Sequence, residues 1–281
     1  MDTSRFRVRP GEQVNLRRYS PVDTSPLKNK RKAAGRLDRG IERLAVLQEK
    51  LYAQNRWAVL LIFQAMDAAG KDSAIKHVMS GLNPQGTQVY SFKRPSDEEL
   101  DHDYLWRTNK ALPERGRIGI FNRSYYEEVL VVRVHPDVLN RQKLPAPLVT
   151  KYLWRDRYDD ITRNGTLVRK FFLHVSKEEQ RRRFLERLDD PSKHWKFAAA
   201  DLDERDRWDE YGRAYEQALT RTSTRHAPWY IVPADHKWFT RLVIAELVIQ
   251  ALESLDLAVP AATRPQLDAL AEARKRLGSE P

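Results

Sequence analysis

One segment of the sequence combines residue types and a spacing that could bind phosphate. Residues 65–73 read Ala-Met-Asp-Ala-Ala-Gly-Lys-Asp-Ser and follow an apolar run that ends at Phe63, with Gln64 between them. A glycine turn before a helix lets successive backbone N–H groups face phosphate oxygens, and the following lysine reaches the terminal phosphates. The strict pattern has Gly where Ala65 stands and Ser or Thr where Asp72 stands. We expect these residues of the loop to bind phosphate: Ala68, Ala69, Gly70, Lys71, Asp72 and Ser73.

Asp67 lies inside this loop, where a carboxylate would repel phosphate unless a cation lies between them. Mg²⁺ prefers oxygen ligands and typically bridges one or two carboxylates to phosphates. We therefore predict that Asp67 is a metal ligand and that Mg²⁺ is the cofactor. Two simpler interpretations stay open from the residues alone. Asp67 could be a helix N-cap, or the whole segment could be an ordinary strand-to-helix turn with a surface lysine.

A second polar cluster follows another short apolar run. It begins Asn-Arg-Ser-Tyr-Tyr-Glu-Glu at Asn122, with Arg133 further on. In phosphoryl-transfer sites an acid at the end of a neighbouring strand helps to hold the metal, and Asn122 takes that place with an amide oxygen that could coordinate. Arg123 could neutralise a transferring phosphoryl group, although solvated or structural arginines are the simpler interpretation of Arg123 and Arg133. Glu127 and Glu128 could orient metal-bound water or the acceptor.

The two clusters can act together only if the strands and helices of the fold place them side by side. Apolar runs of strand length alternate with stretches of helical periodicity, which predicts an α/β fold with a parallel sheet covered by helices on both faces. Ligands bind such sheets beyond the carboxyl ends of the strands. The expected strands are 57–63, 87–92, 118–121, 168–175 and 229–232. The expected helices are 37–51, 73–82, 96–112, 145–165, a lid helix from 177, 203–220 and 239–255, with capping boxes at Ser96 and Glu99 and at Ser176 and Glu179.

The chain is expected to have three parts. These are a basic N-terminal arm (1–35), a domain (36–260) and a helical C-terminal tail (261–281). Within the domain, residues at about 177–207 are predicted to project as a helical lid. Residues 1–39 hold eleven basic and four acidic side chains, and therefore most of the net charge of +11. An excess of basic residues attracts polyanions in general. The alternative is that the arm is exposed to solvent and binds no partner.

The lid is the second basic region. Residues 177–196 carry seven basic side chains against five acids, and in a helix Arg183 and Arg187 share a face because they are four residues apart. We expect Arg182, Arg183 and Arg187 to bind phosphate groups. The alternative is an amphipathic helix with a solvated charged face. Trp195 and Phe197 are expected to anchor the lid rather than to pack against a base.

Composition excludes several classes of protein. The chain has no cysteine, which excludes disulfides, thiol catalysis and Cys-ligated zinc. The longest apolar run, 57–63, is far shorter than the ~20 residues that cross a bilayer. The N-terminus shows no apolar signal segment. We expect a cytoplasmic protein with no membrane partner.

Four stretches together resemble the polyphosphate kinase 2 family. They are residues 65–73, 121–130, 188–197 and 227–238, and the resemblance covers roughly residues 35–255. It implies a three-layer P-loop kinase fold of the thymidylate-kinase type, with the parallel sheet between helices and a helical lid. It also implies Mg²⁺-dependent phosphoryl transfer between inorganic polyphosphate and nucleotides. Asn at position 122, followed by Arg-Ser-Tyr-Tyr-Glu, resembles the branch that phosphorylates both AMP and ADP.

The resemblance also implies roles for single residues. Asp67 and Lys71 match the metal ligand and the phosphate-binding lysine of the loop, and Arg133 and Arg183 match positions that contact polyphosphate. Asn122 stands where other branches carry Asp, so a second carboxylate ligand is left open. The catalytic set implied is Asp67, Lys71, Arg123, Arg133 and Arg183, with Asp67 and Asn122 as the metal ligands.

The expected function is a reversible transfer from polyphosphate to AMP and ADP that forms ADP and ATP. The partners are then polyphosphate, AMP, ADP and ATP, with no nucleic acid, in a homo-oligomer (a dimer or tetramer). Two alternatives are an ATP-dependent nucleotide kinase and a non-catalytic protein that binds polyanions or nucleic acid. Asp72 and the basic lid argue against the first, and the presence of both Asp67 and Lys71 argues against the second.

Overall fold

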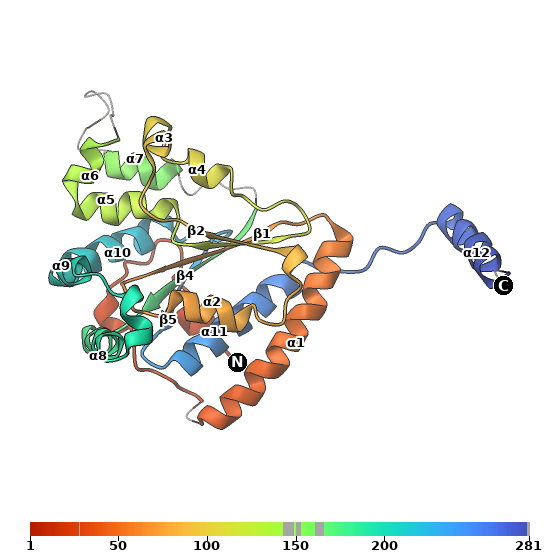
Figure 1. The fold of residues 1–281 in the computed structure, drawn as a ribbon, viewed down its shortest axis with the longest axis horizontal. Coiled ribbons are helices and arrows are strands. Elements are labelled where there is room, and N and C mark those ends of the chain that lie inside the picture. The colour runs from red at the N-terminus through yellow and green to blue at the C-terminus, as the bar shows by residue number, and fades with distance from the viewer. Residues whose placement is uncertain (28, 143–148, 150–152, 161–165, 280–281) are drawn as a thin grey trace.

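A five-stranded parallel sheet forms the centre of the molecule (Figure 1). In the computed structural model, residues 1–27, 29–142, 149, 153–160 and 166–279 are described. The strand order is β2-β3-β1-β4-β5. The strands are β1 (Val59–Ala65), β2 (Thr87–Ser91), β3 (Ile118–Asn122), β4 (Leu167–His174) and β5 (Trp229–Pro233). The predicted α/β class with a parallel sheet is confirmed.

Helices cover both faces of this sheet (Figure 1). Among the described residues they are α1 (Lys30–Gln54), α2 (Lys71–Val78), α3 (Asp97–Asp101), α4 (Trp106–Asn109), α5 (Val131–Val134), α6 (Pro136–Asn140), α7 (Leu153–Asp160), α8 (Lys177–Leu188), α9 (Ala200–Asp206), α10 (Trp208–Thr222), α11 (Lys237–Glu253) and α12 (Arg264–Gly278). Short 3-10 helices are η1 (Ser4–Phe6), η2 (Leu16–Arg18), η3 (Pro84–Gly86), η4 (Tyr125–Val129) and η6 (Pro191–Lys196). None of the described helices is long and apolar enough to cross a membrane.

The central strand β1 shows why the sheet is covered on both sides. Residues 59–63 are wholly apolar and fully buried, as is typical of a parallel strand between two helical layers. Helices α1, α2 and α11 bury one face of the sheet, and η4, α10 and the N-terminal segment bury the other. Helix α11 is apolar on nearly all sides because it lies between the sheet and α1.

The N-terminal arm packs against the domain along strand β5. Val8 donates its N–H to the carbonyl of Trp229 at 2.9 Å, and Arg7 forms a bridge with Tyr230. Phe6 and Val8 are buried, so the arm extends the core and covers the edge of the sheet. The helix that follows begins at Lys30, earlier than the expected start at 37, because Asn29 caps it through the N–H groups of the next turn.

Two expected helices are broken in the structure. The capping box of Ser96 and Glu99 is confirmed, but its helix ends at Asp101, and Asp103 starts a new turn by accepting the N–H of Leu105. The helix expected at 203–220 is divided at Arg207 into α9 and α10. The expected ends of the helix 145–165 lie outside the described residues; of its described residues, 153–160 are helical and Val149 is not.

The second expected capping box is only half formed. Ser176 accepts the N–H of Glu179 at 3.0 Å, as predicted. The carboxylate of Glu179 does not return to Ser176, because it binds Arg182 and Arg183, and Asp235 takes the Ser176 N–H at 2.8 Å instead. The tail forms α12, whose residues are exposed and which lies apart from the sheet at the end of an extended connection (Figure 1).

Candidate active site

The pairing of β1 with β3 brings the two polar clusters together. Phe63 pairs with Asn122 at the carboxyl ends of these neighbouring strands. Arg123 then donates its backbone N–H to the carbonyl of Phe63 at 3.0 Å. The loop that contains Asp67 and Lys71 therefore lies beside Asn122 and Arg123, at the edge of the sheet where ligands bind.

The phosphate-binding loop, residues 65–73, has a constrained backbone. Gly70 has φ +100° and Ala68 has φ +57°, and Arg123 opposite has φ +63°. Non-glycine residues pay roughly 1–3 kcal/mol for such conformations, which persist where the surrounding structure enforces them. Helix α2 begins directly after Gly70, and no side chain caps it among the described residues. Its first N–H groups are therefore available to an anion.

Helix α8 holds this loop through its backbone carbonyls. Gln180 donates to the carbonyl of Asp67 at 3.0 Å. Arg183 donates to the carbonyls of Ala68 and Ala69 at 2.9 and 2.8 Å. Three consecutive carbonyls are thus bound by the lid helix, which fixes the direction of the peptide groups of the loop.

Arg183 is a buried brace in this arrangement, with 4% of the residue exposed. Its remaining N–H groups donate to the carboxylate of Glu179 at 2.7 Å and to the carbonyls of Ala234 and Asp235 at 2.7 and 3.0 Å. All five N–H donors of a guanidinium are then used by the protein. Arg183 therefore positions the loop through its carbonyls, and its expected contact with polyphosphate stays a prediction.

Lys71 lies half-buried at the start of α2. Its Nζ donates to the carbonyl of Ala65 at 3.2 Å, back across the loop. Burial lowers the pKa of Lys71, and the nearby positive charge of Arg123 lowers this pKa further. Two cations held so close together attract an anion, and a bound phosphate would offset their mutual repulsion.

Arg123 lies between two carboxylates. Its guanidinium is 3.2 Å from Asp67 and 3.9 Å from Glu127. The charge of Glu127, followed by that of Asp67, raises the pKa of Arg123 in spite of burial. Asp67, Lys71, Arg123 and Glu127, all four of them expected site residues, therefore form one charged cluster, and their roles toward metal and phosphate stay predictions.

Asn122 contacts the loop through Asp72. Its Nδ2 donates to Asp72 Oδ1 at 2.5 Å, which leaves the amide oxygen as the atom that could ligate a metal. No group of three or more His, Cys, Asp or Glu side chains that could hold a metal lies among the described residues. The donor set of Asp67 and Asn122 suits Mg²⁺, which keeps several water ligands and needs only one or two protein oxygens beside phosphate.

Several residues of the site were missed by sequence analysis. Asp201 of α9 lies near the loop, since burial and then the charge of Asp67 raise its pKa. It is 4.0 Å from Arg187. Gln64 is fully buried beneath the loop, donates to Glu127 at 2.9 Å, and has an Oε1 with no hydrogen-bond partner in the described part of the chain. A polar side chain at the end of an otherwise apolar strand was the available signal for Gln64.

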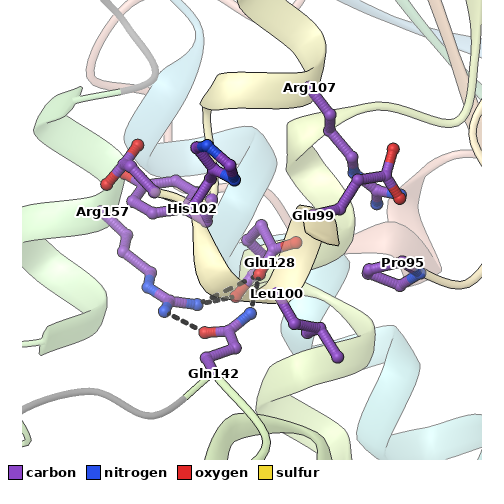
Figure 2. A pocket seen from close by; sticks show the side chains of 10 residues that line it. Pro95, Glu99, Leu100, His102, Arg107, Glu128, Gln142 and Arg157 are labelled. Atoms are coloured by element: carbon purple, nitrogen blue, oxygen red, sulfur yellow. Dashed lines mark hydrogen bonds and ion pairs between the residues drawn. The ribbon is translucent and has the colours of Figure 1, made fainter. Parts of the chain in front are cut away.

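Glu128 lies in a separate pocket rather than in the charged cluster. Figure 2 shows it beside Gln142 and Arg157. Glu128 accepts hydrogen bonds from Gln142 at 2.5 Å and from Arg157 at 3.4 Å. Burial raises the pKa of Glu128, although both neighbours act in the opposite direction. The pocket is also lined by Glu99, His102 and Arg107. Glu128 thus supports η4, and among the described residues its side chain is bonded to Gln142 and Arg157 rather than to the phosphate-binding loop.

The other predicted arginines have local partners. Arg133 donates to the hydroxyl of Tyr158 at 2.9 Å. Arg182 is exposed and pairs with Glu179 and Glu186, and Arg187 donates to the carbonyl of Lys196 at 3.0 Å. Their expected contacts with phosphate stay predictions. In the lid, the ring of Phe197 packs edge-on against Phe184, whereas Trp195 is 79% exposed.

Comparison with known proteins agrees with this geometry. Residues 27–259 match the family described as Polyphosphate kinase 2. An ADP-polyphosphate phosphotransferase of Rhodopseudomonas palustris is 52% identical over 98% of both chains. An AMP/ADP-polyphosphate phosphotransferase of Meiothermus ruber is 43% identical over 91% of this chain and 95% of its own. The crystal structure of Polyphosphate Kinase 2 from Arthrobacter aurescens TC1 has a TM-score of 0.86 and 40% identity, covering 98% of this chain and 95% of that chain. With its loop, its lid and these relatives in agreement, the chain belongs to the polyphosphate kinase 2 family.

Proposed function

We propose that the protein transfers phosphoryl groups reversibly from inorganic polyphosphate to AMP and ADP, forming ADP and ATP. The observation that carries this proposal is the cluster of Asp67, Lys71 and Arg123 at the ends of two neighbouring strands. The cluster offers two cations and a loop of backbone N–H groups to a phosphate chain. The similarity to phosphotransferases named for ADP and for AMP/ADP supports the choice of acceptors.

The chemistry asks little of the protein beyond positioning and charge. A phosphate oxygen of the nucleotide attacks the terminal phosphorus of the donor chain, and the bond from that phosphorus to the bridging oxygen breaks. The shortened chain leaves with the bridging oxygen. The attacking oxygen is already ionised, so no general base is needed. Lys71 and Arg123 stabilise the charge on the transferring oxygens, and the loop holds them in line.

The residues present fit a bound Mg²⁺ ion. Asp67 would hold it, with the amide oxygen of Asn122 as a further ligand beside water and phosphate. When bound, the ion supplies neutralisation of charge shared by donor and acceptor phosphates. Asp67 contributes even without the ion, because its carboxylate orients Arg123 across the 3.2 Å ion pair.

The lid gives the site a means of excluding water. Helix α8 binds the loop directly, and Asp201 of α9 comes close to Asp67. A lid that closes over the phosphates prevents water from competing with the nucleotide as acceptor. A cytoplasmic location and assembly into a homo-oligomer stay predictions.

The test is nucleotide analysis after incubation of the purified protein with AMP or ADP, polyphosphate and Mg²⁺. We expect ADP and ATP to form, and the rate to fall to the background without Mg²⁺. The variant Lys71→Ala should lose on the order of 10²–10³-fold in rate, because it removes a charge used in the transition state. ATP-driven nucleotide phosphorylation without transfer from polyphosphate, or retention of nucleic acid alone, would refute the proposal. Wild-type turnover by Lys71→Ala would place this lysine outside the site.

A further inference from the structure

Gln64 is a buried polar residue whose presence the phosphate-binding loop does not explain. It lies at the end of β1 and is fully buried. Side chains alternate along a strand, so Gln64 faces the same side of the sheet as Leu60 and Ile62, toward η4 and α10. Leu60 and Ile62 are apolar core residues on this side. Gln64 therefore places one amide at the point where the core meets the charged cluster.

The amide of Gln64 is only half satisfied. Its Nε2 donates to Oε1 of Glu127 at 2.9 Å. Its Oε1 is buried and accepts no hydrogen bond in the part of the chain that the structure describes. A buried acceptor without a donor lowers stability, and a catalytic role is one of the reasons for which native proteins keep such a group. An apolar side chain of the same length would avoid this loss, so the hydrogen bond to Glu127 is the reason for a glutamine at this position.

Glu127 connects Gln64 to the cations of the site. One oxygen of its carboxylate, Oε1, accepts from Gln64, and the other, Oε2, lies 3.9 Å from Nη1 of Arg123. Arg123 in turn donates to Oδ1 of Asp67 at 3.2 Å. The two oxygens of Glu127 thus have two different partners, which fix the direction of the carboxylate toward Arg123.

The surroundings of Lys71 show why this direction matters. Three carboxylates lie close enough to Lys71 to oppose the effect of burial on its pKa: Asp67, Glu127 and Asp72. Within the described ranges Lys71 forms an ion pair with none of them, because each carboxylate has another partner. One such partner of Glu127 is Gln64. The ammonium group of Lys71 therefore stays available to phosphate.

We infer that Gln64 is a positioning residue, which keeps the carboxylate of Glu127 directed at Arg123 and away from Lys71. This role rests on the proposed function, because Lys71 and Arg123 act on the transferring phosphoryl group. The neutral amide of Gln64 donates a hydrogen bond without adding a third cation to the site. Without this bond, Glu127 would pair with Lys71 and compete with phosphate for it.

The first test compares Gln64→Met with the control Gln48→Met. Gln48 is also buried, but it lies in α1, and its amide nitrogen and oxygen both bind the backbone of Asn83. In Gln64→Met, kcat/KM for transfer from polyphosphate should fall about tenfold, the scale of one charged hydrogen bond. Its Tm should equal or exceed that of the wild type, because the unpartnered oxygen is removed. In Gln48→Met, Tm should fall by about 4 °C, since two hydrogen bonds are lost, and kcat/KM should stay at the wild-type value.

The second test is the pH profile of Gln64→Glu. Its new carboxyl group can donate to Glu127 only when it is protonated, and a neighbouring carboxylate favours the protonated form. The rate of this variant relative to the wild type should therefore rise as pH is lowered from about 8.5 to about 6. The other titratable groups around Glu127 are the same in both proteins, so the ratio isolates the new carboxyl group. These groups are Asp67, Lys71, Arg123, Tyr211 and Tyr215.

Two results would overturn the inference. One is a kcat/KM of Gln64→Met that equals that of the wild type. The other is a ratio of Gln64→Glu to wild-type rates that stays constant across this pH range. Calorimetry of polyphosphate binding without nucleotide separates the inference from the proposed function. A wild-type protein that transfers no phosphoryl group, yet binds polyphosphate more tightly than Gln64→Met, would refute the proposed function alone.

Discussion

Replacement of Arg183 by alanine tests whether this residue braces the loop or grips the donor. The side chain is buried and donates to four backbone carbonyls, those of Ala68, Ala69, Ala234 and Asp235. An unsatisfied buried acceptor costs about 1–3 kcal/mol. We take the lower end because the space left by the truncated side chain admits water. Four carbonyls then make Arg183→Ala less stable by about 4 kcal/mol.

The assay is thermal and urea unfolding beside the transfer rate. In a protein of 281 residues, about 4 kcal/mol lowers Tm by about 7 °C, and transfer should fall because the carbonyls of the loop lose their support. The matched control is Arg182→Ala. Arg182 is the neighbouring arginine on the same helix, its side chain is 56% exposed, and its ion pairs with Glu179 and Glu186 are worth below about 1 kcal/mol.

An Arg183→Ala variant that unfolds like the wild type but needs far more polyphosphate would refute the bracing role. It would show that Arg183 contacts the donor, as the resemblance implies. Arg183→Lys separates the cases further, because the ammonium keeps the charge but has only three donors for the same carbonyls. We expect its stability to lie between those of the wild type and Arg183→Ala.

Two further predictions concern Asp67 and Lys170. Asp67→Asn should raise the Mg²⁺ concentration for half-maximal transfer by at least about tenfold, since it removes the charged ligand; an unchanged Mg²⁺ titration would contradict the ligand role. Lys170 is fully buried in β4, donates to Tyr126 and Thr222, and has a pKa well below its ordinary value of 10.5 because of burial. At a pH between the lowered pKa and 10.5, the unfolded chain binds more protons at this lysine than the folded protein does. The free energy of unfolding therefore increases as pH rises through this range. Urea unfolding at about pH 7 and pH 9 should show that difference in the wild type and a smaller one in Lys170→Met; equal differences would contradict the assignment.

Local sequence signals were sufficient for most elements of the fold. The apolar run before Asp67 is a buried central strand, and the helix at 239–255 is buried on nearly all sides. These predictions hold because a parallel strand and a buried helix are defined by the hydrophobicity of contiguous residues. The breaks at Asp103 and Arg207 were missed, because helical periodicity continues across them in the sequence.

The residues of the candidate site were also predictable from the sequence only in part. The loop and the Asn-Arg pair could be found from the sequence because phosphate binding needs particular residue types at short spacing. The roles of the lid arginines could not. Arg182 and Arg183 are adjacent in a basic run. Arg182 is exposed, whereas Arg183 is buried and donates all of its N–H groups to other atoms of the protein. Which of two neighbouring arginines is buried depends on the orientation of α8 against the loop.

By itself, the sequence determined the chemistry that the protein can offer: a phosphate-binding turn, an acid for a cation, and a strand order that alternates with helices. Only the tertiary structure decided which charges meet. Lys71 and Arg123 are brought together by the pairing of β1 with β3, and Arg241 reaches Ser73 because β5 directs α11 toward the loop. These contacts join residues that are 52 and 168 positions apart in the sequence. Electrostatic energy depends on the distance between charges in space and on their burial, and neither can be read from the local spacing of residues.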